Sequence, residues 1–266
     1  MNLKEKIYYE GGGLPNLRYH IVNIGAPGSG KSYMMKQMGH PEFGIFSGTT
    51  AHFQFEGNLT ESGFVGTIQR SQTGEVTLVE GAASENRFGF ILFDEFSALR
   101  DAMRQSYNSQ LETQMLMALD SGMVNKRLGN GRITYNTNFT LWGGVQPVRT
   151  DLSSGLGRRL CVLLHKTTMS DNERMIDAQF NSMNVSINEA RLQKLWERID
   201  YWTNSFKLIR SIDFDRSIAQ FYKDLDADHT NVPIYNKTLI GYTLARHGAE
   251  KNLTISDDDE EMFNLV

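Results

Sequence analysis

Short apolar runs, each bounded by polar or glycine-rich segments, recur between residues 20 and 165 of the chain. Such runs are typical of buried strands, and we expect four of them, at 21–24, 90–93, 139–142 and 160–164. Helices are expected at 32–38, directly after Phe96, and at 111–119, where apolar residues share one face. Strands that alternate with helices predict an α/β fold, with a parallel sheet that is flanked by helices.

The pattern changes beyond about residue 170, where apolar residues repeat at helical spacing. The two apolar stripes consist of Ile187, Leu192, Leu195, Trp196 and Ile199, and of Ile218, Phe221, Tyr222 and Leu225. We therefore expect an α/β domain over 1–168 and a small all-α domain over 169–256. Residues 257–266 are expected to form a flexible tail, because its five consecutive acidic side chains repel one another.

Composition is that of a folded globular protein, with 40% apolar and 22% charged residues among 266. The net charge of −4 argues against a uniformly basic nucleic-acid binder, although basic residues can still be confined to a few loops. The only cysteine, Cys161, lies in an expected strand, which favours a buried residue in a reducing compartment over a nucleophile. The first residues lack the apolar h-region that is typical of a signal peptide, and no apolar run approaches the roughly 18 residues of a membrane span. We expect no membrane partner and a cytoplasmic location, or the host cytoplasm if a mobile element encodes the chain.

A glycine-rich segment directly follows the first expected strand and fits the pattern G-x-x-x-x-G-K-[ST]. Glycines let successive backbone N–H groups face phosphates, the lysine supplies a positive charge, and the final hydroxyl can hold Mg²⁺. The sequence therefore predicts an ATP site. Its expected binding residues are Gly25, Pro27, Gly28, Ser29, Gly30, Lys31, Ser32 and Tyr33.

Asp94 and Glu95 follow the second apolar run. An aspartate at this position can hold Mg²⁺ together with Ser32, while the adjacent glutamate orients the attacking water. An isolated Asp-Glu pair is more often an ordinary strand end. Here four apolar residues precede the pair and Lys31 accompanies it, so we expect a metal ligand in Asp94 and a catalytic group in Glu95.

Three further residues are expected to act in catalysis beside Lys31 and Glu95. Gln146 follows the strand expected between the two phosphate-site strands, where its amide can reach the terminal phosphate, although a purely structural role is the alternative. Arg158 and Arg159 precede the last strand and can project toward the nucleotide of a neighbouring copy. For both arginines the alternative is simple solvation at the surface.

A basic hairpin is expected over 124–135, with two strand-like arms around Gly129-Asn130-Gly131. Its charged residues are Lys126, Arg127 and Arg132, which is a local basic concentration in a chain of net negative charge. Such a concentration suits the phosphate backbone of DNA. Solvated surface residues would give the same pattern, so both interpretations stay open.

Several blocks of the chain, taken in order, resemble the AAA+ core of minichromosome maintenance (MCM) helicases and their relatives, which include the magnesium chelatases. The blocks are 60–68 and 73–82, then 93–96, 116–133, 146–147, 152–154 and 156–159. They are similar to that family's helix-2 insert, Walker B motif, presensor-1 hairpin, and sensor-1 and arginine-finger region. The resemblance covers about residues 20–165, with a weaker similarity at 237–245.

The resemblance implies a P-loop AAA+ fold with a C-terminal helical lid, ATP and Mg²⁺ as cofactors, and a homo-oligomer in the form of a hexameric ring. It also implies two insertions that point into the ring's channel, at 72–75 and 126–132. Gln146 departs from the family's asparagine, Arg159-Leu160 replace its aromatic-acid pair, and no sensor-2 arginine is identified. The residues given contain no counterpart of the replicative helicases' N-terminal DNA-binding domain, which makes a loading protein a further expected partner.

These features lead to one preferred function and two alternatives. We expect an oligomeric Mg-ATP hydrolase that translocates or remodels DNA, as in DNA replication. The first alternative is an ATPase that remodels a protein partner, as its chelatase-like relatives do. The second is a ring that assembles with nucleotide and barely hydrolyses it, although the complete Asp94-Glu95 pair argues against this hypothesis.

Overall fold

The computed structural model describes residues 19–40, 44–47, 52–87, 89–129, 131–152, 155–181, 189–206, 209, 211–247 and 252–256. The expected acidic tail at 257–266 and the apolar position Ile187 lie outside the described residues. None of the helices in the described part of the chain is long and apolar enough to cross a membrane.

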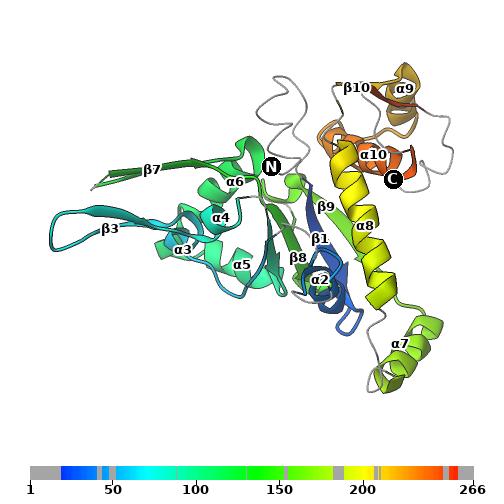
Figure 1. Ribbon diagram of the computed structural model, residues 1–266, viewed down its shortest axis with the longest axis horizontal. Helices are drawn as coiled ribbons and strands as arrows, with labels where there is room; N and C mark the ends of the chain where they lie inside the picture. The colour runs from blue at the N-terminus through cyan, green and yellow to red at the C-terminus, as the bar shows by residue number, and fades with distance from the viewer. Residues whose placement is uncertain are drawn as a thin grey trace.

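A five-stranded parallel sheet forms the centre of the α/β fold (Figure 1). Its order is β2-β5-β8-β1-β9, so β8 lies between β1 and β5. The strands are β1 (His20–Gly25), β2 (Phe53–Glu56), β5 (Phe90–Phe93), β8 (Thr140–Val145) and β9 (Leu160–His165). The four expected strands are confirmed, and the edge strand β2 was not expected.

Helices cover both faces of this sheet, and two adjacent glycines of β8 mark where they approach it. On one face, a Cβ added to Gly144 would lie 3.3 Å from Cε of Met35 in α2 (Lys31–Gly39). On the opposite face, a Cβ added to Gly143 would lie 2.7 Å from the ring of Phe96, the first residue of α5 (Phe96–Met103). The main core lies on the α5 side and also contains α6 (Leu111–Ser121). The expected helices at these three places are confirmed.

The α2 face has a second core, which is small and contains polar atoms. Met35, Leu92 and Trp142 form its buried centre. Asn23 of β1 is on the same face as these residues by strand alternation, and it is fully buried. Both polar atoms of the Asn23 side chain and the indole N–H of Trp142 are buried without a hydrogen-bond partner among the described residues.

Two antiparallel hairpins extend from the sheet in the same direction (Figure 1). They are formed by β3 (Thr67–Arg70) with β4 (Val76–Val79), and by β6 (Met123–Leu128) with β7 (Gly131–Asn136). A Cβ on Gly131 would lie 2.9 Å from Cδ1 of Ile68, so the hairpins contact each other. The short helices α3 (Glu61–Val65) and α4 (Ala82–Glu85) flank the first hairpin in sequence. The hairpin expected at 124–135 is confirmed, and the segment 72–75 lies in the turn between β3 and β4.

The C-terminal part is mainly helical and has its own core, in which Ile218, Leu239 and Ile255 are buried. Its helices are α7 (Met169–Asn181), α8 (Glu189–Phe206), α9 (Arg216–Asp224) and α10 (Val232–His247). The expectation of an all-α unit over 169–256 is wrong, because β10 (Ser211–Phe214) pairs in parallel with β11 (Asn252–Ile255). Each of these strands is four residues long, so its alternation gives little signal in the sequence.

A Gly143→Ala substitution is expected to lower the free energy of unfolding by about 1–3 kcal/mol, because the new methyl group overlaps the buried Phe96 ring. Gly241→Ala in α10 is the control, since a Cβ there meets nothing within 4 Å. The control should change stability by no more than about +1 kcal/mol through helix propensity. Urea unfolding followed by circular dichroism measures both, and equal midpoints for Gly143→Ala and the parent would contradict the packing described.

Candidate functional site: the carboxyl edge of the sheet

The glycine-rich segment forms the turn from β1 to α2. Gly28 has φ of 78° and Gly30 has φ of 85°, both in the left-handed region that favours glycine. A Cβ at either position would meet nothing within 4 Å, so backbone conformation rather than crowding requires glycine here. The turn thereby presents an open stretch of backbone directly before the helix.

The start of α2 suits an anion. Gly30 is its N-cap residue and provides no side-chain cap, and the first helical hydrogen bond runs from the N–H of Met34 to the carbonyl of Gly30 at 2.9 Å. The N–H groups of Lys31, Ser32 and Tyr33 have no acceptor among the described residues. Free N–H groups and the positive end of the helix dipole therefore coincide, which is the arrangement that binds phosphate groups.

The Lys31 ammonium group lies inside the turn. Its Nζ donates to the carbonyls of Gly25 at 2.6 Å and Ala26 at 2.8 Å, and to the hydroxyl of Ser29 at 3.3 Å. The residue is only 9% exposed. All three acceptors are neutral, so this buried positive charge has no counter-ion within the turn, and a bound anion would supply one.

Three of the expected site residues meet this turn because parallel strands end at the same edge. Phe93 of β5 pairs with Gly143 of β8, and Val145 of β8 pairs with Ile24 of β1. Asp94, Gln146 and Gly25 thus come at or just beyond the carboxyl ends of three adjacent strands. A Cβ on Gly144 would lie 3.0 Å from the carbonyl oxygen of Asp94 and 3.8 Å from Cβ of Lys31.

The acidic pair has two different environments. Asp94 is exposed and has no described partner, so its carboxylate is available to a cation. Glu95 is half-buried, and its Oε1 accepts a hydrogen bond from the hydroxyl of Ser97 at 2.5 Å. The Ser32 hydroxyl likewise has no described partner, so Ser32 and Asp94 could hold Mg²⁺ from two sides of the edge. Glu95 is held in one orientation and could position a water.

Hydrogen bonds hold the backbone of Gln146 in place, while its side chain is available. Its carbonyl accepts hydrogen bonds from the N–H of Arg149 at 3.0 Å and from the Thr150 hydroxyl at 2.9 Å, within the 3₁₀ turn η2 (Pro147–Arg149). The side-chain amide has no described partner and is half-buried. An amide so placed can donate to a phosphate oxygen or orient a water.

His165, which was not among the expected site residues, ends β9 in register with Gly25. A Cβ on Gly25 would lie 2.8 Å from Cβ of His165 and 2.5 Å from Oγ of Ser29, so the histidine packs against the glycine-rich turn over residues 25–30, which is called the phosphate turn after its expected ligand. Burial, and then the charge of Lys31, lower the pKa of His165 below its usual value. A polar residue directly after an apolar run was the available signal.

Arg158 and Arg159 lie at the amino ends of the parallel strands, opposite the carboxyl edge that carries the glycine-rich turn. Both are in η3 (Gly157–Arg159), directly before β9, where Leu160 pairs with His20 at the start of β1. At about 3.3 Å per residue, the length of β9 separates this end from the phosphate turn by about 16 Å, which is more than an arginine side chain spans. Neither arginine is brought to the phosphate turn of its own chain.

The two arginines differ in what they bind. The guanidinium of Arg159 donates two hydrogen bonds to the Asp120 carboxylate and one to the carbonyl of Gly155. Arg158 is exposed, and its charge is only the smallest of the causes that lower the pKa of Asp228, the largest being the backbone N–H of Thr230. Arg159 thus fixes η3 to α6 within the chain, and Arg158 is available to another molecule.

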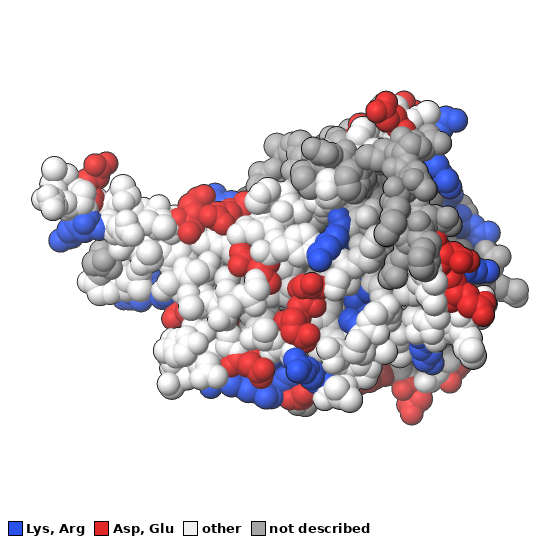
Figure 2. Space-filling model, turned by 90° about the horizontal axis from the view of Figure 1, so that it is seen from below, with Lys and Arg blue, Asp and Glu red and all other residues white. Residues whose placement is uncertain are grey.

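The basic hairpin divides its charges between two faces. Lys126 lies on the inner face, opposite the buried Ile133, and forms an ion pair with Glu61 at 3.0 Å. Arg127 and Arg132 are exposed cross-strand partners on the outer face. Directly opposed like charges, about 5 Å apart at Cβ, destabilise a hairpin and favour an anion between them. On the face in Figure 2, by contrast, the described basic and acidic side chains are interspersed.

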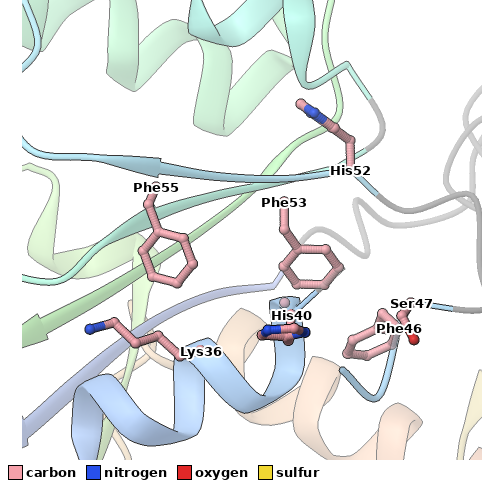
Figure 3. A pocket seen from close by; sticks show the side chains of 8 residues that line it. Lys36, His40, Phe46, Ser47, His52, Phe53 and Phe55 are labelled. Carbon is pink, nitrogen blue, oxygen red and sulfur yellow. The ribbon is translucent and has the colours of Figure 1, made fainter. Parts of the chain in front are cut away.

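A cavity of about 550 Å³ lies away from the phosphate turn, between the C-terminal half of α2 and β2 (Figure 3). Phe46, Phe53 and Phe55 line it beside Lys36, and the rings of Phe53 and Phe90 stack with centroids 4.4 Å apart. None of the expected site residues is among its described lining residues. It is therefore separate from the edge where those residues gather.

Comparison with known proteins adds no assignment. No family model matches the chain, and no curated protein matches its sequence. The function is therefore inferred from the geometry of the site.

Replacing Lys126 with methionine is expected to cost about 1–2 kcal/mol of unfolding free energy, because Glu61 stays largely buried and loses its partner. Arg127→Met, on the outer face of the same strand, should change stability by less than about 0.5 kcal/mol. Urea denaturation at neutral pH compares the two. Equal losses would contradict the division of the hairpin into two faces, and the double variant Lys126→Met/Glu61→Leu should recover part of the stability.

Proposed function

We propose that this chain is a Mg-ATP hydrolase with a P-loop AAA+ fold that works as a homo-oligomeric ring and translocates or remodels DNA. One observation carries the proposal: the sheet gathers an anion-binding turn, an exposed aspartate, an oriented glutamate and a free amide at a single edge. A site that only binds an anion would need the turn and none of the other three groups. The addition of a metal ligand and a water-orienting group favours phosphoryl transfer to water.

Each residue has a distinct task in this proposal. The N–H groups at the start of α2 and the Lys31 ammonium hold the phosphates, and Lys31 then exchanges its neutral acceptors in the turn for anionic oxygens. Ser32 and Asp94 hold Mg²⁺, which neutralises charge on the phosphates when it is bound. Glu95 orients and deprotonates the attacking water, and Gln146 donates its amide to the terminal phosphate.

The position of Arg158 supports a ring. Its own phosphate turn is out of reach at the other edge of the sheet, while the side chain is exposed. A neighbour that presents its phosphate turn to this edge would receive the guanidinium, which stabilises charge on the transferring phosphoryl group. Such head-to-tail contacts close into a ring when the rotation between copies allows it. The C-terminal unit would then act as the lid.

Arg127 and Arg132 support DNA as the substrate. They are opposed on the exposed face of a hairpin, where a phosphate would relieve their mutual repulsion. A specific observation favours the alternative, a remodeller of a protein partner: the strand β4 exposes Val76, Leu78 and Val79 to 50%, 42% and 40%. Exposed apolar residues on the neighbouring hairpin suit a polypeptide better than a phosphate backbone.

Turnover per chain is expected to rise with protein concentration, and both Lys31→Ala and Arg158→Ala should lose nearly all of it. For Arg158→Ala the expected loss is about 10³-fold or more. A mixture of equal amounts of these two inactive variants should recover about a quarter of the parental rate, because one in four random interfaces pairs an intact Lys31 with an intact Arg158. Steady-state phosphate release measures the turnover of the parent, of each variant and of the mixture.

Arg216→Ala, an exposed arginine at the start of α9, is the matched control and should keep the parental rate. Glu95→Gln should bind ATP normally and fail to hydrolyse it. An active Arg158→Ala variant, or turnover per chain that is constant over all concentrations, would overturn the shared site. Normal hydrolysis by Glu95→Gln would overturn the role of that glutamate.

Single-stranded DNA binding is expected to weaken when Arg127 or Arg132 is replaced by alanine, and the slope of log affinity against log salt should fall by about 0.7 for each. Lys126→Met should leave that slope unchanged, because Glu61 already neutralises the lysine. Fluorescence anisotropy with a labelled oligonucleotide over a salt series measures the slopes. Equal slopes for all variants, or no binding by the parent, would favour the protein-remodelling alternative.

A further inference from the structure

His165 is a polar residue at the phosphate turn to which none of the proposed catalytic steps gives a role. A Cβ added to Gly25 would lie 2.8 Å from Cβ of His165 and 2.5 Å from Oγ of Ser29, so these two side chains lie close together beside Gly25. Lys31 donates to that same Ser29 hydroxyl at 3.3 Å. The imidazole is therefore beside the group that is expected to hold the phosphates.

The surroundings of His165 oppose its protonation while the turn holds no anion. Burial is the larger cause of its lowered pKa, and the Lys31 charge is the second. Among the described residues, Lys31 is the charged group whose field acts on the imidazole, since Gly25 of β1 and Ser29 of the turn carry no charge. No described residue forms a hydrogen bond with its ring, which is half-buried and accessible.

We propose that His165 is an additional ligand of the nucleotide's phosphates and takes up one proton from solvent when they bind, so that affinity for the nucleotide increases as pH falls. This inference rests on the proposed nucleotide-binding function. Protonation gives the ring two N–H donors, and a donor that faces a phosphate oxygen then forms a charge-assisted hydrogen bond. The phosphates also offset the positive field of Lys31, which opposes protonation in the free protein.

The sign of the pH effect follows from linkage. Bound phosphates raise the pKa of His165 from its lowered value in the free protein. Between the free and bound pKa values, binding is accompanied by proton uptake, and affinity falls as pH rises. Above the bound value the imidazole is neutral in both states, and its contribution is lost. The effect therefore lies in the range from about pH 5 to pH 8, where histidine titrates.

Isothermal titration calorimetry of the full chain with Mg-ATP, in two buffers of different ionisation enthalpy, tests the proposal. The Glu95→Gln background prevents turnover, and His165→Gln in that background removes the titrating group while it keeps a neutral amide. Near pH 6.5, the Glu95→Gln parent should take up more protons on binding Mg-ATP than the Glu95→Gln/His165→Gln variant. Its affinity for Mg-ATP should be about tenfold higher than that of the double variant at pH 6 and equal to it at pH 8.5. The nucleotide's own titration is common to both and cancels.

His229→Gln is the matched control, because His229 has a side chain that is 95% exposed and lies in the C-terminal unit, and it should behave as the parent does. Inorganic tripolyphosphate should reproduce the extra proton uptake, and adenosine should not, since the phosphates are the proposed contact. Imidazole shifts in ¹³C NMR spectra of the parent, which need no His165 variant, should report a higher pKa when tripolyphosphate is bound.

Nucleotide binding with the same proton uptake in His165→Gln as in the parent would overturn the role of His165 and leave the proposed function intact. An unchanged imidazole pKa on saturation with tripolyphosphate would do the same. Failure of the parent to bind Mg-ATP at any pH would overturn the proposed function, and this inference with it.

Discussion

Parallel pairing of β1 with β8, and of β8 with β5, is the constraint on which the whole candidate site depends. It brings the phosphate turn, the acidic pair and Gln146 to one edge, although these segments are far apart in the sequence. A slip of one residue in β8 would move Gly143 and Gly144 to the opposite faces of the sheet. A slip in one direction would bring Val145 against Met35, and a slip in the other would bring Trp142 against Phe96, so this pair of glycines keeps the register.

The two edges of the sheet carry complementary halves of the proposed chemistry. The carboxyl edge holds the turn and Lys31, and the amino edge holds Arg158. A single chain cannot join them, because the strands themselves separate them. Arg159 stabilises this arrangement by binding Asp120 and so keeps the turn that presents Arg158 in a fixed place.

Strong local signals made much of the architecture and the phosphate turn predictable from the sequence. The glycine pattern before Lys31 requires specific backbone angles, and apolar runs bounded by polar or glycine-rich segments indicate the central strands. The weaker elements were not predictable. β2 has only four residues at an edge, and β10 pairs with β11 across an intervening pair of helices.

Side-chain partnerships across elements were beyond local patterns as well. The sequence identifies Lys126 as a basic hairpin residue, but its partner Glu61 belongs to a helix that tertiary packing brings close. His165 was missed for the same reason, since nothing near it in the sequence indicates that Gly25 is its neighbour. Residue type and spacing suggested the proposed chemistry, whereas the fold decides which of these charges are already neutralised.

The small core between α2 and the sheet has a consequence for the free energy with which this helix packs. Asn23 and Trp142 have buried polar atoms without a hydrogen-bond partner among the described residues, and each such atom costs about 1–3 kcal/mol. The apolar contacts that Met35 of α2 makes with Leu92 and Trp142 must offset this cost. The helix that follows the glycine-rich turn is therefore packed on its side of the sheet with a smaller net gain in free energy than an entirely apolar surface would give.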